Sequence, residues 1–105
     1  MKRMNVETLK EWRDSGKEHQ LIDVREPHEY EAANLNGELI PLGEVPRRMD
    51  EVNKDIPVVM QCRSGGRSAV AAELIERQYP GIEIYNLEGG ILDWKRKFDP
   101  GLNVS

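Results

Sequence analysis

The stretch IPVVMQCRSGGRSAVAAELIERQY, from Ile56 to Tyr79, decides the fold. Its first part, Ile56 to Cys62, is apolar on both faces, which is typical of a central strand in a parallel sheet. Its last part, from Ser68 onward, predicts a helix that ends at Pro80 and Gly81. The face that we expect this helix to bury consists of Val70, Ala71, Leu74, Ile75 and Gln78. A buried strand followed closely by an amphipathic helix indicates an α/β fold.

Strands and helices also alternate on both sides of this stretch. Asn5 is a suitable N-cap for a short helix that stops at Gly16. The other predicted elements are a buried strand over Gln20–Val24, a short edge or terminal strand over Glu38–Leu42, a short helix over Val45–Val52, a strand over Ile82–Leu87 and a last helix over Ile91–Phe98. This order predicts an open, mostly parallel sheet of about four to five strands flanked by helices, with residues 1–105 as a single domain.

The composition is that of a globular protein, with 38% hydrophobic and 32% charged residues. The net charge of -4 argues against a general nucleic-acid binder, so we expect any anion site to be local. No apolar run approaches the roughly 20 residues of a membrane helix, and the first residues have no signal-peptide pattern. The single cysteine cannot form a disulfide within the chain. We therefore expect a cytoplasmic protein that binds neither nucleic acid nor membrane.

Cys62 lies where the predicted central strand ends and a helix follows, the place where α/β proteins bind ligands. Gly65 and Gly66 allow successive backbone N–H groups to point inward at an anion. The helix N-terminus and the charges of Arg63 and Arg67 favour thiolate over thiol. Such surroundings lower the pKa of a cysteine from about 8.5 to about 3.5–7.5, so we expect a nucleophile. The alternative is a small buried core residue, which would make this cradle a coincidence.

Four stretches of the chain carry a family resemblance. They are LIDVREPHEY (Leu21–Tyr30), IPL (Ile40–Leu42), CRSGGRS (Cys62–Ser68) and NLEGGILDW (Asn86–Trp94). Together they resemble the single-domain rhodanese family, sulfurtransferases whose cysteine at a strand end carries a persulfide. The segment ANLNGE (Ala33–Glu38) departs from the family's usual Gly-His-Ile-x-Gly-Ala turn and keeps only its second glycine. This departure bears on subfamily and partner more than on chemistry.

The resemblance implies covalent sulfur transfer through Cys62. A small anionic donor such as thiosulfate would leave its sulfur on Cys62 as a persulfide, and a thiol, cyanide or protein acceptor would then remove it. The persulfide itself would be the only carrier, with no metal or organic cofactor. The residues that we expect to form the loop for the anion are Arg63, Ser64, Gly65, Gly66, Arg67 and Ser68.

Four charged residues receive supporting roles in this interpretation. We expect Arg63 to project from the rim of the loop and to attract the donor. Arg67 is expected to be more structural, pairing with an acidic residue near the base of the loop. Asp23 and Arg25 would orient strand and loop through charge-assisted hydrogen bonds, as structural rather than catalytic groups.

Two other functions remain as alternatives. Cysteine-dependent phosphatases and arsenate reductases also use a loop from Cys to Arg, but their loops have five intervening residues where this chain has four between Cys62 and Arg67. The shorter loop favours sulfur transfer. The second alternative is a non-catalytic module that delivers or receives sulfur within a complex. The last residues, FDPGLNVS, resemble the end of rhodanese domains fused behind adenylating enzymes.

Overall fold

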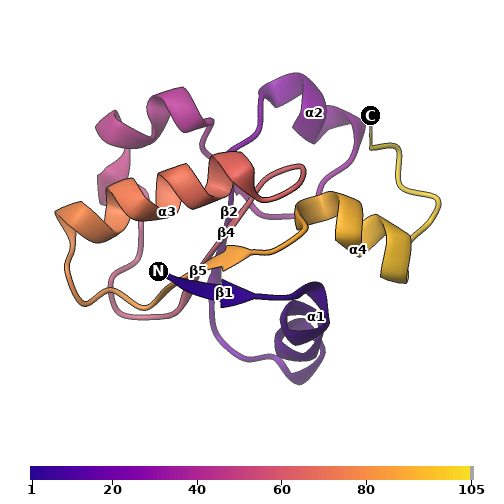
Figure 1. Ribbon diagram of the computed structural model, residues 1–105, viewed down its shortest axis with the longest axis horizontal. Helices are drawn as coiled ribbons and strands as arrows, with labels where there is room; N and C mark the ends of the chain where they lie inside the picture. The colour runs from indigo at the N-terminus through magenta and orange to yellow at the C-terminus, as the bar shows by residue number, and fades with distance from the viewer. Residues whose placement is uncertain (105) are drawn as a thin grey trace.

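A five-stranded parallel sheet forms the centre of the computed structural model, which describes residues 1–104 (Figure 1). The strand order is β1-β5-β4-β2-β3. The strands are β1 (Lys2–Met4), β2 (Gln20–Asp23), β3 (Glu38–Leu39), β4 (Val58–Gln61) and β5 (Ile84–Leu87). β4 lies in the middle of the sheet and is buried throughout, as predicted. The predicted α/β fold with a parallel sheet is therefore confirmed.

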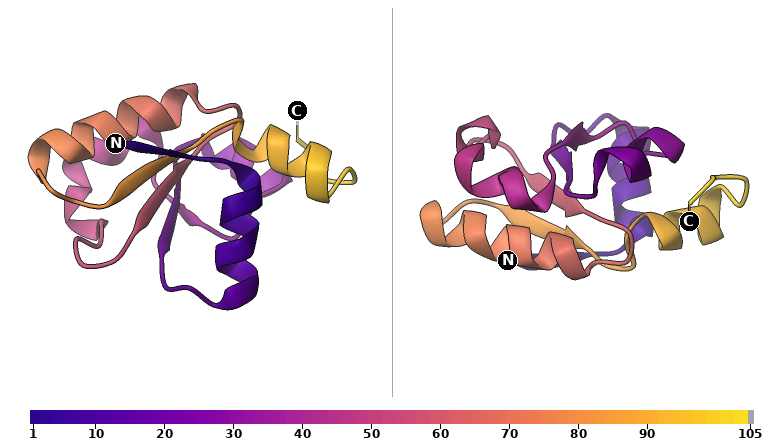
Figure 2. Two further views of the ribbon diagram at one scale, coloured as in Figure 1. Left: turned by 60° about the horizontal axis from the view of Figure 1, so that its bottom comes forward. Right: turned by 90° about the horizontal axis from the view of Figure 1, so that it is seen from above.

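Helices cover both faces of this sheet. They are the α-helices α1 (Val6–Ser15), α2 (Pro27–Ala32), α3 (Gly66–Gln78) and α4 (Gly90–Phe98) and the 3-10 helices η1 (Leu42–Arg47) and η2 (Met49–Glu51). Figure 2 shows α3 and α1 on opposite sides of the strands. One core cluster joins α3 and η1 to one sheet face, and a second joins α1 and α4 to the other. No helix within residues 1–104 is long and apolar enough to cross a membrane.

The buried face of α3 differs from the predicted one. Its buried residues are Ser68, Ala71, Ala72 and Ile75, whereas Val70 is 50% exposed and Gln78 is also exposed. The small side chains of Ala71 and Ala72 let α3 lie close against the sheet. Because apolar residues occur on two sides of this helix, periodicity alone did not identify the side that faces the sheet.

Two other local predictions need correction, and two elements were missed. The segment predicted as one short helix over Val45–Val52 instead contributes to the two 3-10 helices η1 and η2. Pro46 lies inside η1. Because proline has no backbone N–H group, it favours a short 3-10 turn over a regular α-helix. The edge strand shrinks to the two residues of β3, ahead of Pro41. Neither β1 nor α2 was predicted. β1 pairs with β5, and α2 begins with Pro27 after a capping box between Glu26 and Glu29.

Candidate active site

Cys62 follows the last residue of β4 and begins the loop that leads to α3. The loop lies between α2 and the start of α4 (Figure 1). The residue is only 1% exposed, so its sulfur lies inside the loop rather than on its rim. In parallel strands all carboxyl ends meet at one edge of the sheet, and the ends of β2 and β5 therefore adjoin Cys62.

Hydrogen-bond donors surround the sulfur of Cys62. The Gly65 N–H donates to Sγ at 3.1 Å, and the Ser68 Oγ lies 3.3 Å from Sγ. Burial acts to raise the pKa of Cys62, but hydrogen bonds from the Ser68 hydroxyl and from backbone N–H groups of the loop outweigh it. The pKa of Cys62 is therefore lower than that of an ordinary thiol, which favours a nucleophilic thiolate.

Only one of the two loop glycines depends on glycine's conformational freedom. Gly65 has a φ of 111°, which L side chains rarely adopt, and it is the N-cap of α3. Gly66 is already helical, and a Cβ built on it would meet no atom within 4 Å. The sequence predicted that both glycines would use this conformational freedom, and only Gly65 does so.

Arg67 pairs with Glu29 of α2, so the predicted partnership with an acidic residue is confirmed. Its two terminal guanidinium nitrogens, Nη1 and Nη2, donate to the two carboxylate oxygens at 2.7 and 2.9 Å. The hydrogen bond from Arg67 lowers the pKa of Glu29 to about 2. Hydrogen bonds from Ser68 and from backbone N–H groups of the loop are larger causes of the lowered pKa of Cys62 than the charge of Arg67. Arg63 lies exposed at the rim of the loop, as expected.

Asp23 and Arg25 form a buried ion pair at the carboxyl end of β2. Both side chains are at most 2% exposed, and the Arg25 Nη2 donates to the Asp23 Oδ2 at 2.8 Å. The same nitrogen donates to the backbone carbonyl of Ala33, at the end of α2, also at 2.8 Å. Arg25 thus ties β2 to the helix whose Glu29 holds Arg67. The hydrogen bonds of the pair run to the end of α2, and its supporting role in orienting the loop stays a prediction.

The segment after β5 holds the loop from its other side. The backbone N–H groups of Ile91 and Leu92 donate to the carbonyls of Cys62 and Arg63, at 3.0 and 3.1 Å. Because these carbonyls are bound from outside, the N–H groups of the loop are left to face inward. Gly90 makes the approach possible, since a Cβ there would lie 2.4 Å from the Cys62 carbonyl oxygen.

Asn86 of β5 is a residue of the site for which the sequence predicted no role. Its Nδ2 donates to the Gly65 carbonyl at 3.0 Å, and its Oδ1 accepts from the Ser68 hydroxyl at 2.5 Å. The available signal was the match of the stretch Asn86–Trp94 to the family. A match to the family does not show which atoms of the cysteine loop Asn86 contacts, because the loop is distant from Asn86 in the sequence.

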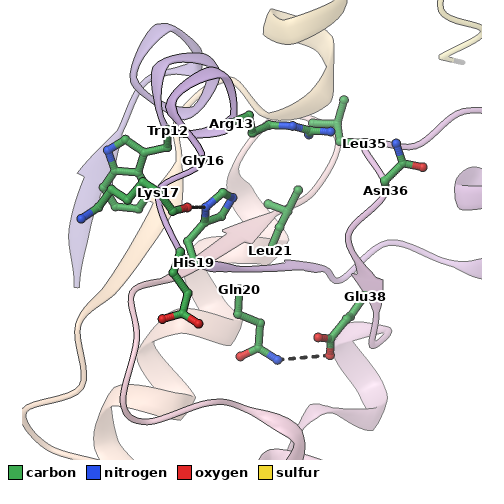
Figure 3. Close-up of a pocket in the computed structure, with 11 residues that line it drawn as sticks. Trp12, Arg13, Gly16, Lys17, His19, Gln20, Leu21, Leu35, Asn36 and Glu38 are labelled. Atoms are coloured by element: carbon green, nitrogen blue, oxygen red, sulfur yellow. Dashed lines mark hydrogen bonds between the residues drawn. The ribbon is translucent and has the colours of Figure 1, made fainter.

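A separate pocket of about 490 Å³ lies at the opposite end of the strands (Figure 3). It is lined by the end of α1, the loop that follows α1, the start of β2 and the turn before β3. On its rim, the Gln20 Nε2 donates to the Glu38 Oε2 at 3.1 Å. Gln20 is the first residue of β2, whereas Cys62 follows the last residue of the parallel strand β4. No residue of the cysteine loop lines this pocket, so it is distinct from the sulfur site.

Comparisons with known proteins agree with this geometry. The family model of the rhodanese-like domain matches residues 5–97. The uncharacterized protein YqhL of Bacillus subtilis (strain 168) is 40% identical over 95 residues, which are 90% of this chain and 75% of that protein. A protein named sulfurtransferase from Allochromatium vinosum is 40% identical over 77 residues, covering 72% of this chain and 71% of that protein.

Solved structures are similar over the whole chain. The crystal structure of a rhodanese-like domain protein from Staphylococcus aureus superposes with a TM-score of 0.82 and 32% identity, covering 100% of this chain and 99% of that one. Some other relatives are longer proteins, and this chain spans 51% of the length of one and 24% of another. The same fold thus occurs both alone and as part of larger proteins.

Proposed function

This chain belongs to the rhodanese-like domain family, and on that premise we propose that it is a sulfurtransferase whose Cys62 carries the transferred sulfur. The observation that carries the proposal is the enclosure of the Cys62 sulfur by the Gly65 N–H group and the Ser68 hydroxyl. A thiolate held in this way is nucleophilic near neutral pH. The name sulfurtransferase given to a relative of 40% identity supports the same reaction class.

In the first half-reaction, the Cys62 thiolate attacks the outer sulfur of thiosulfate. A new sulfur–sulfur bond forms on Cys62 as the bond between the two sulfur atoms of thiosulfate breaks. Sulfite leaves with the electron pair of the broken bond, and the Cys62 persulfide carries the negative charge. The inward N–H groups of the loop stabilise this charge, in the manner of an oxyanion hole.

In the second half-reaction, cyanide or a thiolate attacks the outer sulfur of the persulfide. The bond to Cys62 breaks, its electron pair returns to the Cys62 sulfur, and thiocyanate or a new persulfide leaves. Neither half-reaction requires a further oxidant or reductant, and this scheme uses no metal or organic cofactor. A free thiolate is kept reduced most readily in the cytoplasm, where we place the reaction.

The donor would be small and anionic, and it would approach past the rim of the loop. Arg63 is exposed there, and its charge would attract thiosulfate. A protein thiol or persulfide would need to present its sulfur on an extended segment, because Cys62 itself is buried. Phosphoryl transfer is the competing chemistry for such a loop, and we include it in the test.

The test is intact-protein mass spectrometry after incubation with thiosulfate. We expect the wild-type protein to gain one sulfur atom and to lose it again, as thiocyanate, when cyanide is added. Cys62→Ser should do neither while keeping the wild-type melting temperature, since Ser and Cys are similar in size. A parallel assay with p-nitrophenyl phosphate should detect no turnover. Thiocyanate formation by Cys62→Ser at the wild-type rate, or rapid phosphate release by the wild type, would refute the proposal.

A further inference from the structure

Asn86 contacts Gly65 and Ser68, two of the residues that hydrogen-bond to the Cys62 sulfur. It belongs to β5 and is 3% exposed. Its Nδ2 donates to the carbonyl of Gly65, whose N–H points at the sulfur, and its Oδ1 accepts from the hydroxyl of Ser68. A third contact joins the Nδ2 to the Glu88 Oε2 at 3.3 Å. Asn86 itself makes no hydrogen bond to the sulfur, so any effect on it passes through Gly65 and Ser68.

The Ser68 hydroxyl has one proton and two neighbouring acceptors. Its Oγ lies 2.5 Å from the Asn86 Oδ1 and 3.3 Å from the Cys62 Sγ. The shorter contact is the stronger hydrogen bond, so the proton points to Asn86 while Cys62 is a neutral thiol. The hydroxyl can then accept from the thiol S–H. Once the sulfur carries negative charge, it competes for the same proton, and a charge-assisted hydrogen bond to sulfur becomes favourable.

An amide is the side-chain group that fits these surroundings. The Gly65 carbonyl can only accept, and the Asn86 amide gives it a second donor beside the Ala69 N–H group. The Ser68 hydroxyl needs an acceptor that releases its proton easily. Asparagine offers both on one planar group. An aspartate would retain the Ser68 proton with a full charge and would repel the Gly65 carbonyl. An alanine would leave the proton to the sulfur alone.

We infer that Asn86 is a positioning residue that divides the Ser68 proton between its own amide oxygen and the Cys62 sulfur. The inference rests on the proposed sulfur transfer, because only a reaction at the sulfur gives this proton a catalytic consequence. Asn86 thereby adjusts how strongly the loop stabilises charge on the thiolate and on the persulfide. The role deepens the proposed mechanism by adding a group from β5 to the residues of the loop.

The test compares Asn86→Asp with Asn86→Ala by the pH dependence of Cys62 alkylation with iodoacetamide. We expect Asn86→Asp to raise the midpoint by about one pH unit, since the carboxylate retains the Ser68 proton and adds negative charge. We expect Asn86→Ala to lower the midpoint, by about half a pH unit, because the hydroxyl then donates to sulfur alone. The Gly65 carbonyl stays bound in both variants, since it also accepts from the Ala69 N–H.

Two controls separate this role from a structural one. Asn53→Asp makes the same chemical change in an exposed turn, where the Asn53 Oδ1 accepts from the Asp55 N–H, and should leave the midpoint unchanged. In a Ser68→Ala background, Asn86→Ala should no longer lower the midpoint. If thermal melting shows that Asn86→Asp does not fold, the effect of Asn86→Ala with and without Ser68 still shows whether Asn86 acts through the Ser68 hydroxyl.

Two results would overturn the inference. One is a shift in the same direction for both Asn86 variants, as expected if the loop merely loosens. The other is an Asn86→Ala shift that persists without Ser68. Alkylation requires no sulfur donor, so these results are independent of whether thiosulfate is a substrate. If the protein gains no sulfur in the mass-spectrometric test, the proposed sulfur transfer is refuted. The alkylation experiment would still test the role of Asn86 in dividing the Ser68 proton.

Discussion

At the scale of single residues, Cys62 and its loop could be predicted from the sequence because they are contiguous. The thiol, the glycines and the arginines occur within seven positions, Cys62–Ser68, and their chemistry is local. Asn86 and Glu29 could not be assigned in this way. Each contacts the loop from another part of the chain, and only the three-dimensional arrangement brings Glu29 to Arg67 across 38 positions.

The two loop glycines give a prediction at this scale. Gly65→Ala forces a side chain onto a residue with φ of 111°, which should cost about 1–2 kcal/mol and misdirect the N–H that points at the sulfur. We expect at least a tenfold loss of kcat/KM for thiosulfate. Gly66→Ala is the matched control, because its Cβ meets open space and alanine favours a helix. Steady-state kinetics and urea denaturation of both variants provide the measurement, and equal losses in the two would contradict this prediction.

At the scale of elements, the strength of a periodic pattern decided what could be predicted. β4 and α3 have long apolar patterns and were identified, although the orientation of α3 was not. None of the six residues of α2 is buried, so this helix has no apolar periodicity and is marked only by its capping residues. β1 has three residues, of which only Met4 is buried. Such elements depend on pairing and docking partners that are distant in sequence.

The docking of α2 on the loop predicts a dependence of stability on acid. In the folded protein the pKa of Glu29 is about 2, below the value of about 4.3 in an unfolded chain. The stabilisation is therefore fully present above about pH 4.3 and is lost as the pH falls toward 2. Because the Arg67 side chain is 36% exposed, solvent screening reduces the contribution to about 1–2 kcal/mol.

The variant Glu29→Gln tests this contribution by urea denaturation between pH 7 and pH 2. At pH 7 it should be about 1–2 kcal/mol less stable than the wild type, and the difference should shrink as the pH falls toward 2. Glu73→Gln removes the same charge from an exposed position on α3 and should follow the wild-type curve. A Glu29→Gln difference that stays constant down to pH 2 would show that the ion pair is not its source.

At the scale of the whole molecule, the alternation of strands and helices predicted the parallel sheet, and the parallel sheet explains the site. All strands end at the same edge, so the buried pair at the end of β2, the cysteine after β4 and the segment after β5 converge without any local signal in the sequence. The order β1-β5-β4-β2-β3 could not be derived from periodicity. The order depends on which strands pair with each other, and two of these pairs, β1 with β5 and β2 with β4, join strands that are not consecutive in the sequence.

The charge of the whole molecule gives the last prediction. With a formal net charge of -4, the protein repels an anion such as thiosulfate at long range, so attraction must come from cations close to the loop. Arg63 is exposed at the rim of the loop. Arg63→Ala should therefore raise KM for thiosulfate several-fold at low salt and make KM less sensitive to salt, with little change in melting temperature.

Arg77→Ala is the matched control, because it changes the net charge equally but lies near the other end of α3, far along the helix from the loop. If the electric field close to the loop attracts thiosulfate, only Arg63→Ala should change the salt dependence of KM. Charges more than about 10 Å away are screened at an ionic strength of about 0.1 M. Initial rates at several thiosulfate and salt concentrations provide the measurement. Equal changes in KM for both variants would mean that the net charge of the protein governs the binding of thiosulfate. A melting temperature of Arg63→Ala well below that of the wild type would assign Arg63 a structural role.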